Sequence, residues 1–126
     1  MDYGSARTGV AVSDPTGTLA RPFGVIEGVP PHIRIEMIAA LVAEAQAEVV
    51  VVGLPLTLRG EEGAQARETS EFVEVLRGRL DVPVETYDER FTTSMAAAAP
   101  SKAGSEDARA AAHLLESWLA WTSREA

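Results

Sequence analysis

Carboxylate side chains stand in three short stretches of the sequence where they could act together. Asp2 lies in MDYGSARTGVAVSD, Asp88 and Glu89 are neighbours in VETYDERFTTS, and Asp107 opens the last apolar-periodic segment. Converging carboxylates repel one another strongly unless cations lie between them. Their oxygens are ligands that Mg²⁺ and Mn²⁺ prefer, and a pair of such ions can activate a water and stabilise the leaving oxygen of a phosphodiester. The residue types therefore raise the hypothesis of a divalent-metal site.

Each of these carboxylates also has an ordinary explanation. Asp107 near the start of a helix is what the helix dipole favours, a contribution of about 0.3–1 kcal/mol. Asp2 could be a solvated residue beside the start of the chain, and Asp88 with Glu89 could be a surface pair neutralised by Arg90. Taken one at a time, these explanations are the better ones. The metal hypothesis depends on the fold bringing the three stretches together.

Two hydrophobic periods alternate along the chain, and they predict the elements that would position these residues. Alternation favours strands at 7–13 and 83–88, and apolar residues at three- and four-residue steps favour helices. Four consecutive valines before Gly53 are typical of a central parallel strand covered on both faces. Residues 14–31 are rich in proline and glycine, which predicts a loop with at most one short edge strand at 23–26. Helices are predicted at 32–47, 63–80 and 106–122, the last with Ser105 as its N-cap.

This order of elements predicts an α/β fold with a mixed sheet and helices on its faces, in one domain over residues 1–126. Functional groups in such sheets gather beyond the carboxyl ends of the strands. A helix packed across that edge could bring Asp107 to the same place as the other carboxylates. The side chains expected to face the core from the three helices are Ile35, Ile38, Val42, Ala45, Phe72, Val73, Leu76, Leu80, Ala111, Leu114, Leu115, Trp118 and Trp121.

Composition narrows the class of protein without identifying it. The chain has 126 residues, 46% of them hydrophobic and 24% charged, and no cysteine, which suits a reducing cytoplasm. No apolar run is long enough to span a membrane, so no membrane partner is expected. The net charge of −8 argues weakly against a nucleic-acid partner, whose phosphates favour a basic face. Bound divalent cations can invert that sign locally.

Four stretches taken together resemble one family. DYGSARTGVAVSD, VVVVGLPLTLRGEEG, DERFTT and DARAAAHLLESWL look like the successive signatures of the YqgF/RuvX family, in the same order. The resemblance implies an RNase H-like fold related to the Holliday junction resolvase RuvC, with a five-stranded mixed sheet flanked by helices. It also implies a nuclease dependent on Mg²⁺ or Mn²⁺, with two ions in the site. The implied activity is processing of the 5′ end of pre-16S ribosomal RNA or cleavage of branched DNA.

The resemblance also assigns roles to individual residues. It places Asp2, Glu89 and Asp107 as catalytic residues and metal ligands, with Asp88 as a fourth catalytic candidate. Side chains that alternate along a strand point to opposite faces, so Asp88 and Glu89 need not both be ligands. The residues expected to contact substrate or orient the carboxylates are Gly4, Arg7, Gly53, Pro55, Arg90, Thr92 and Thr93.

The sequence departs from the family pattern in two places. Members carry several apolar residues before the first aspartate, whereas only Met1 precedes Asp2 here, and we expect that this strand has been clipped. The segment between DERFTT and Asp107 is shorter than in the family and keeps only Lys102 as a basic residue, with Arg109 just beyond.

Two other readings of the sequence remain open. A non-catalytic nucleic-acid-binding module for ribosome assembly would keep the fold without efficient chemistry. DYGS also looks like the phosphate loop of actin-like and sugar kinases, but those enzymes need a second domain that 126 residues do not provide. Nothing in the sequence distinguishes a monomer from a homodimer.

Overall fold

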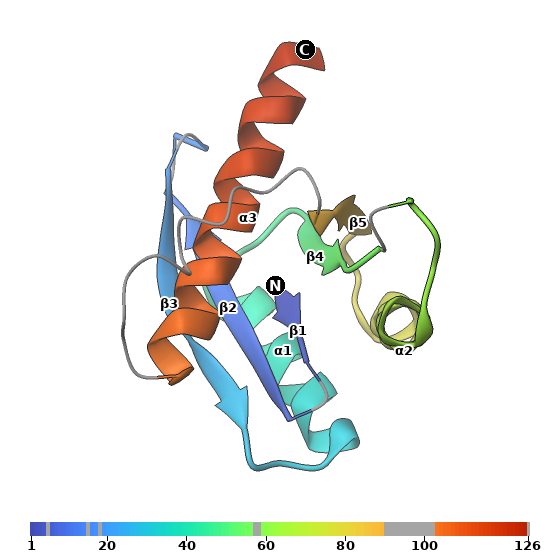
Figure 1. Ribbon diagram of the computed structural model, residues 1–126. Coiled ribbons are helices and arrows are strands. Elements are labelled where there is room, and N and C mark those ends of the chain that lie inside the picture. Colours follow the sequence, from blue (N-terminus) through green and yellow to red (C-terminus); the bar gives the residue numbers. More distant parts are fainter. Residues whose placement is uncertain (5, 15, 18, 57–58, 90–102, 126) are drawn as a thin grey trace.

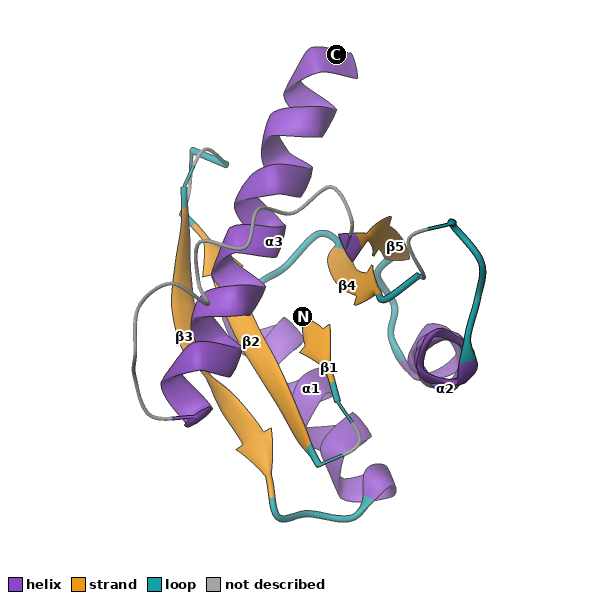
Figure 2. Ribbon diagram, viewed as in Figure 1, coloured by secondary structure: helices purple, strands orange, loops and turns teal. Residues whose placement is uncertain are grey.

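In the computed structural model three consecutive strands are followed by alternating helices and strands, as in an α/β fold (Figures 1 and 2). The structure describes residues 1–4, 6–14, 16–17, 19–56, 59–89 and 103–125. Within them the elements are β1 (Asp2–Tyr3), β2 (Arg7–Ser13), β3 (Ala20–Glu27), α1 (Pro31–Ala45), β4 (Val50–Leu54), α2 (Ala64–Arg79), β5 (Val84–Asp88) and α3 (Ala103–Glu125). The predicted α/β class and each predicted helix and strand are confirmed, with two differences in extent.

The first difference is β3, which is a full strand of 8 residues instead of a short edge segment. It pairs with β2 from Arg7 opposite Glu27 to Ser13 opposite Ala20, with a shift in register after Val10. Pro22 is tolerated because β3 lies at the edge of its sheet, where a missing N–H donor costs no ladder bond. The second difference is α3, which begins at Ala103. Ser105 is therefore inside the helix and the predicted N-cap is wrong.

The strands form an antiparallel sheet in the order β1-β2-β3 and a parallel pair, β4-β5. Backbone hydrogen bonds at Met1 connect the two. The Met1 amino group donates to the Val51 carbonyl, and the Met1 carbonyl accepts the Gly53 N–H at 3.0 Å. This alternation of partners is the hydrogen-bond pattern of parallel neighbours. The start of the chain therefore lies alongside β4.

Helices cover both faces of the strands: α3 lies in front of β2 and β3 in Figure 1, and α1 lies behind them. Successive side chains of β4 point alternately to the two faces of the strand. Val50 and Val52 belong to the larger core with α1 and α2, and Val51 packs with Leu114 of α3. Leu114 is 1% exposed, and burying a side chain of this size contributes about 1.5–3 kcal/mol. Three of the four valines, Val50 to Val52, thus form a strand buried on both faces, as predicted, and Val49 lies just before it.

Most of the predicted core residues are buried or packed against the core, but Ala45 is exposed and Trp121 is 46% exposed, so these two predictions are wrong. Trp121 belongs to the C-terminal part of α3. Its ring still contacts that of Tyr87, with 6.2 Å between the ring centroids. No helix in the described part of the chain is both long and apolar enough to cross a bilayer.

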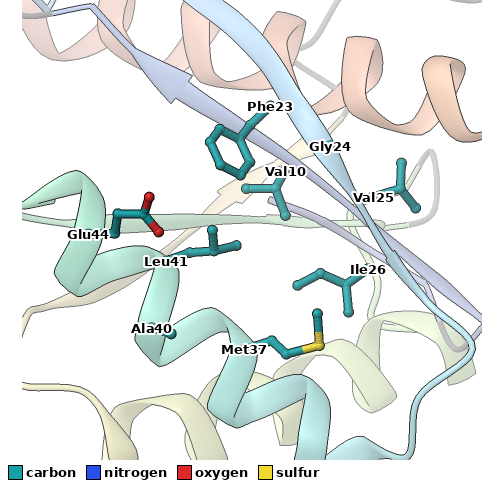
Figure 3. Close-up of a pocket in the computed structure, with 9 residues that line it drawn as sticks. All are labelled: Val10, Phe23, Gly24, Val25, Ile26, Met37, Ala40, Leu41 and Glu44. Atoms are coloured by element: carbon teal, nitrogen blue, oxygen red, sulfur yellow. The ribbon is translucent and has the colours of Figure 1, made fainter.

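A hollow of about 320 Å³ lies between β3 and α1 (Figure 3). Phe23 and Met37 are partly exposed at this hollow, and Glu44 lies at its end. The rest of the described lining is glycine and apolar side chains: Val10, Gly24, Val25, Ile26, Ala40 and Leu41. A surface of this kind offers nothing to hold a phosphate. The carboxylates singled out in the sequence lie elsewhere.

Close backbone contact at one glycine fixes α3 against β2. A Cβ atom built on Gly9 would overlap the carbonyl group of Asp107, which belongs to the helix backbone. Backbone atoms at a helix–strand contact cannot move aside as the end of a flexible side chain can. Glycine at position 9 therefore sets how closely the first turns of α3 approach the strands.

Replacing Gly9 with alanine should destabilise the fold. Overpacking against a backbone carbonyl costs typically about 1–3 kcal/mol, so urea unfolding of Gly9→Ala should show a loss of this size. Gly24→Ala is the matched control, because a Cβ at Gly24 in the adjoining strand meets nothing within 4 Å. Equal stabilities of the two variants would contradict the proposed contact.

Candidate active site

Asp2 and Glu89 meet at one place although 86 positions separate them in the sequence. Asp2 begins β1, and Glu89 directly follows the end of β5. The two carboxyl groups act on each other: after burial, the charge of Asp2 and a side-chain hydrogen bond with it help to raise the pKa of Glu89. The pair can therefore share a proton, since a hydrogen bond between two carboxyl groups needs one.

Gly53 makes the approach of Glu89 possible. A Cβ built on Gly53 would lie 2.9 Å from Cγ of Glu89 and would overlap the side chain of Leu114. The N–H of the same glycine donates to the carbonyl of Met1, beside Asp2. The Glu89 side chain therefore lies over the backbone of β4 and reaches β1. Gly53 was predicted to contact substrate, and this packing gives it a structural role.

Asp107 approaches Asp2 from the other side of β1, because Gly9 permits it. Gly9 is the register partner of Asp2 in the β1–β2 pair, and the Asp107 carbonyl group lies against its Cα. This stacking explains why the charge of Asp107 acts on Asp2 and raises its pKa. The three carboxylates that the sequence placed in separate stretches are thus neighbours.

Burial dominates the electrostatics of the pair. The pKa of Glu89 is raised to about 7. Desolvation is the largest cause, and the charge of Asp2 and the hydrogen bond with Asp2 also contribute. Desolvation also raises the pKa of Asp2, although the hydrogen bond from Glu89 and the nearby amino group act in the opposite direction. A cation at this site would have to displace that proton, because carboxylates bind metals in their deprotonated form, and its affinity would therefore rise with pH.

Arg7 pairs with Asp107, with 3.0 Å between Nε and Oδ2. Both side chains are partly exposed, at 44% and 30%. The Oδ2 atom itself is buried and makes no hydrogen bond, because the contact with Arg7 is close but poorly aligned for one. This oxygen therefore has charge compensation without a directed donor. Arg7 was predicted to contact substrate; in this structure it faces a carboxylate.

The side chains near Asp2 carry oxygen donors of the type that a hard divalent cation takes. Within the described residues, no three Asp, Glu, His or Cys side chains already converge as a metal-binding group. Asp107 pairs with Arg7, whereas Asp2 and Glu89 pair with each other. The Oδ2 atom of Asp107 is buried and lacks a hydrogen-bond donor, and the carboxyl groups of Asp2 and Glu89, once deprotonated, carry oxygens of the kind that Mg²⁺ and Mn²⁺ take. Asp2, Glu89 and Asp107 would be the ligands.

A buried arginine holds the turn that carries Asp2 and Arg7. Arg34 of α1 is 4% exposed and donates from Nη1 to the Gly4 carbonyl at 3.1 Å. Its guanidinium also lies over the ring of Tyr3, 5.7 Å from the centroid, and Tyr3 stacks on Phe72 of α2. Gly4 is needed because a Cβ there would lie 2.6 Å from the Arg7 carbonyl. The turn after β1 is thus anchored to both α1 and α2.

The other predicted site residues lie at the ends of β4 and β5 or outside the described part of the chain. Asp88 ends β5 opposite Leu54, and its charge acts on Glu89 by raising the pKa of that neighbour. Pro55 directly follows β4. The predicted substrate contacts Arg90, Thr92 and Thr93 lie outside the described residues, so their roles stay predictions.

Two residues that shape the site were not anticipated from the sequence. Gly9 had a usable signal, since a glycine inside a strand pattern often marks close approach of another backbone. Arg34 had none, because an arginine next to an apolar stripe is usually a solvated helix residue. Only the arrangement of α1 under the β1–β2 turn shows that its guanidinium is buried.

Comparison with known proteins places the chain in a family. The sequence model described as "RuvX: Holliday junction resolvase" matches residues 1–121. A protein of Chloroflexus aggregans (strain MD-66 / DSM 9485), named "Putative pre-16S rRNA nuclease", is 48% identical over 93 residues. That match covers 74% of this chain and 66% of the relative. For the similar protein of Chloroflexus aurantiacus (strain ATCC 29366 / DSM 635 / J-10-fl), 61% of the relative is covered.

Other relatives match over nearly the whole chain. A protein of the same name from Rhodococcus jostii (strain RHA1) is 42% identical over 137 residues, covering 98% of this chain and 77% of the relative. One from Anaeromyxobacter sp. (strain Fw109-5) is 39% identical over 127 residues, covering 94% and 93%. The match to the family extends from the first carboxylate to the last helix, and the resemblance inferred from four motifs is confirmed. The chain belongs to the RuvX family.

Proposed function

We propose that this protein is a divalent-metal-dependent nuclease that hydrolyses phosphodiester bonds in structured nucleic acid, with the 5′ end of pre-16S ribosomal RNA as its substrate. The observation that carries the proposal is the convergence of Asp2 and Glu89, joined by a hydrogen bond, with Asp107 close enough to act on Asp2. The names of the relatives from Chloroflexus, Rhodococcus and Anaeromyxobacter support the substrate.

The proposal includes an RNase H-like domain over residues 1–126 with a single mixed sheet. Supporting it are the hydrogen bonds of Met1 to Val51 and Gly53, which lie between the antiparallel and the parallel strands. Continued along β1, this pairing gives the strand order β3-β2-β1-β4-β5. In that arrangement β1 is central, and Asp2 lies between the strands that carry Gly9 and Gly53.

In the proposed site, Asp2, Glu89 and Asp107 bind Mg²⁺ or Mn²⁺, which supplies an activated water and stabilises the leaving oxygen. The protein's own contribution is to hold these carboxylates on packed backbone. Gly53 and Gly9 fix the approach of Glu89 and of α3 to β1. Arg34 and Tyr3 hold the turn after Asp2. Such support matters because ligands misplaced by about 1 Å lose activity.

A second candidate is a DNA endonuclease of the Holliday junction resolvase type, favoured by the description of the matching family. Both activities would use the same carboxylates. The two are distinguished by incubating the protein with pre-16S RNA, a four-way DNA junction and plain single strands, each with Mg²⁺, Mn²⁺ or chelator. Metal-stimulated cleavage confined to the junction would replace the RNA assignment.

Neutralising any one of the three carboxylates should abolish cleavage while the fold persists. Asp2→Asn, Glu89→Gln and Asp107→Asn each remove a charged ligand, and we expect at least about a 100-fold loss of rate. Asp81→Asn is the control, because Asp81 is an exposed residue outside the site. Rates are measured on labelled RNA, with circular dichroism to verify folding. Cleavage that survives these changes, or that persists in excess chelator, would overturn the metal mechanism.

The shared proton predicts how stability depends on pH in the metal-free protein. The pKa of Glu89 in the folded state, about 7, lies above its usual 4.5, so the folded state binds this proton more tightly than the unfolded state. Its contribution is therefore present below pH 4.5 and is lost as the pH rises through 7. Allowing for partial exposure of the carboxyl, we expect a loss of about 1–2 kcal/mol between pH 5 and 8.

Urea unfolding in chelator measures this loss of unfolding free energy. Comparison with Glu89→Gln separates the contribution of Glu89 from that of the Met1 amino group and other titrating neighbours. The glutamine variant should lack that part of the pH dependence. Saturating Mn²⁺ at pH 8 should raise the stability of the unmodified protein, by about 2.7 kcal/mol at 100 times the dissociation constant. Identical pH profiles for the two proteins would contradict the shared proton.

A further inference from the structure

The ion pair between Arg7 and Asp107 occupies one of the carboxylates assigned to the metal. Nε of Arg7 is 3.0 Å from Oδ2, the buried oxygen that makes no hydrogen bond. Among the described residues, Asp107 is the one acidic side chain that forms an ion pair with the Arg7 guanidinium. An oxygen that compensates an arginine at this distance cannot be fully available to another cation. Arg7 and a metal ion would compete for it.

The geometry indicates which partner can move. The backbone of Asp107 is fixed on Gly9, where no room remains for even one additional carbon atom. Arg7 stands at the first position of β2, and its side chain is 44% exposed. A long side chain of this kind can swing into solvent at little cost, and a partly exposed ion pair contributes only about 0–1 kcal/mol. The guanidinium can therefore leave while the carboxylate stays.

An arginine released beside the carboxylates would face the nucleic acid. Guanidinium groups bind phosphate with two parallel hydrogen bonds, a stronger and more directed contact than the poorly aligned one with Asp107. The chain has few other cations to offer a polyanion, with 11 basic and 19 acidic residues. A guanidinium at the edge of the site would thus change from compensating a carboxylate to binding a phosphate.

We propose that Arg7 is an exchangeable counter-ion: it compensates Asp107 in the metal-free protein and exchanges this carboxylate for a substrate phosphate when a divalent cation binds. This inference rests on the proposed function, since it needs the cation at the carboxylates. It has a thermodynamic consequence. Metal binding and nucleic-acid binding must strengthen each other by the same factor, because the coupling free energy between two sites is reciprocal.

Mn²⁺ titrations by calorimetry test the competition directly, without any cleavage. Arg7→Gln removes the competing charge, and we expect Mn²⁺ to bind about three- to tenfold more tightly than to the unmodified protein. Arg79→Gln is a matched control, because Arg79 forms a comparable exposed ion pair with Glu36 between α2 and α1, at 2.7 Å. That variant has the same change in net charge and should bind Mn²⁺ with unchanged affinity.

Binding of a fluorescent RNA hairpin, followed by stopped-flow anisotropy before cleavage proceeds, tests the exchange. In the unmodified protein Mn²⁺ should tighten hairpin binding about tenfold or more. In Arg7→Gln, binding should be weaker and the effect of Mn²⁺ should fall to about twofold or less. Arg7→Lys keeps the charge without the paired donors, so its behaviour should be intermediate. This variant also serves if Arg7→Gln fails to unfold cooperatively in urea.

Two results separate the possible failures. If Arg7→Gln binds Mn²⁺ as weakly as the unmodified protein, or more weakly, Arg7 supports the metal site and the exchange is wrong while the nuclease proposal stands. If the unmodified protein binds no Mn²⁺ at all, the proposed function fails and the exchange fails with it.

Discussion

Two glycines beside one short strand make the site possible. Gly9 and Gly53 flank β1 on its two neighbours, and each lies under a segment that carries a carboxylate. Over Gly9 the backbone of α3 comes close enough to bring Asp107 to Asp2, and over Gly53 the side chain of Glu89 crosses β4 to meet the same residue. A methyl group at either position would hold these segments apart. The proximity of Asp2 to Glu89 and to Asp107 therefore depends on backbone packing before it depends on charge.

The same packing makes the metal-free site electrostatically unfavourable. Burial raises the pKa of both Asp2 and Glu89. The negative charge of the site is then reduced by a bound proton and by Arg7, which pairs with Asp107. A fold selected for stability alone would gain by replacing such groups with apolar ones. The strands around them are well packed, with Val52 and Leu76 fully buried, and can support a locally unfavourable site. Strain of this kind is commonly found where a ligand is bound.

Much of the fold could be predicted from the sequence, because apolar periodicity determines which face of each element is buried. The four valines, the stripe of α2 and the strand ending at Asp88 were all located in this way. The length of β3 could not be predicted, because Pro22 and Gly24 look like loop residues until the edge position of the strand explains Pro22. Trp121 continues the helical pattern of α3 but is exposed. Periodicity identifies a face, but not where the covering element ends.

The candidate site was predictable in its residue types but not in its contacts. Motif order placed Asp2, Glu89 and Asp107 together, whereas the partner of each depends on tertiary distances that no local pattern encodes. Arg7 illustrates the difference, since its type suggested a phosphate contact and its position gives it Asp107. In the proposed enzyme Arg7 would do both, at different stages. A protein of net charge −8 would then bind a polyanion because the cations that neutralise its carboxylates would also free an arginine for the phosphate.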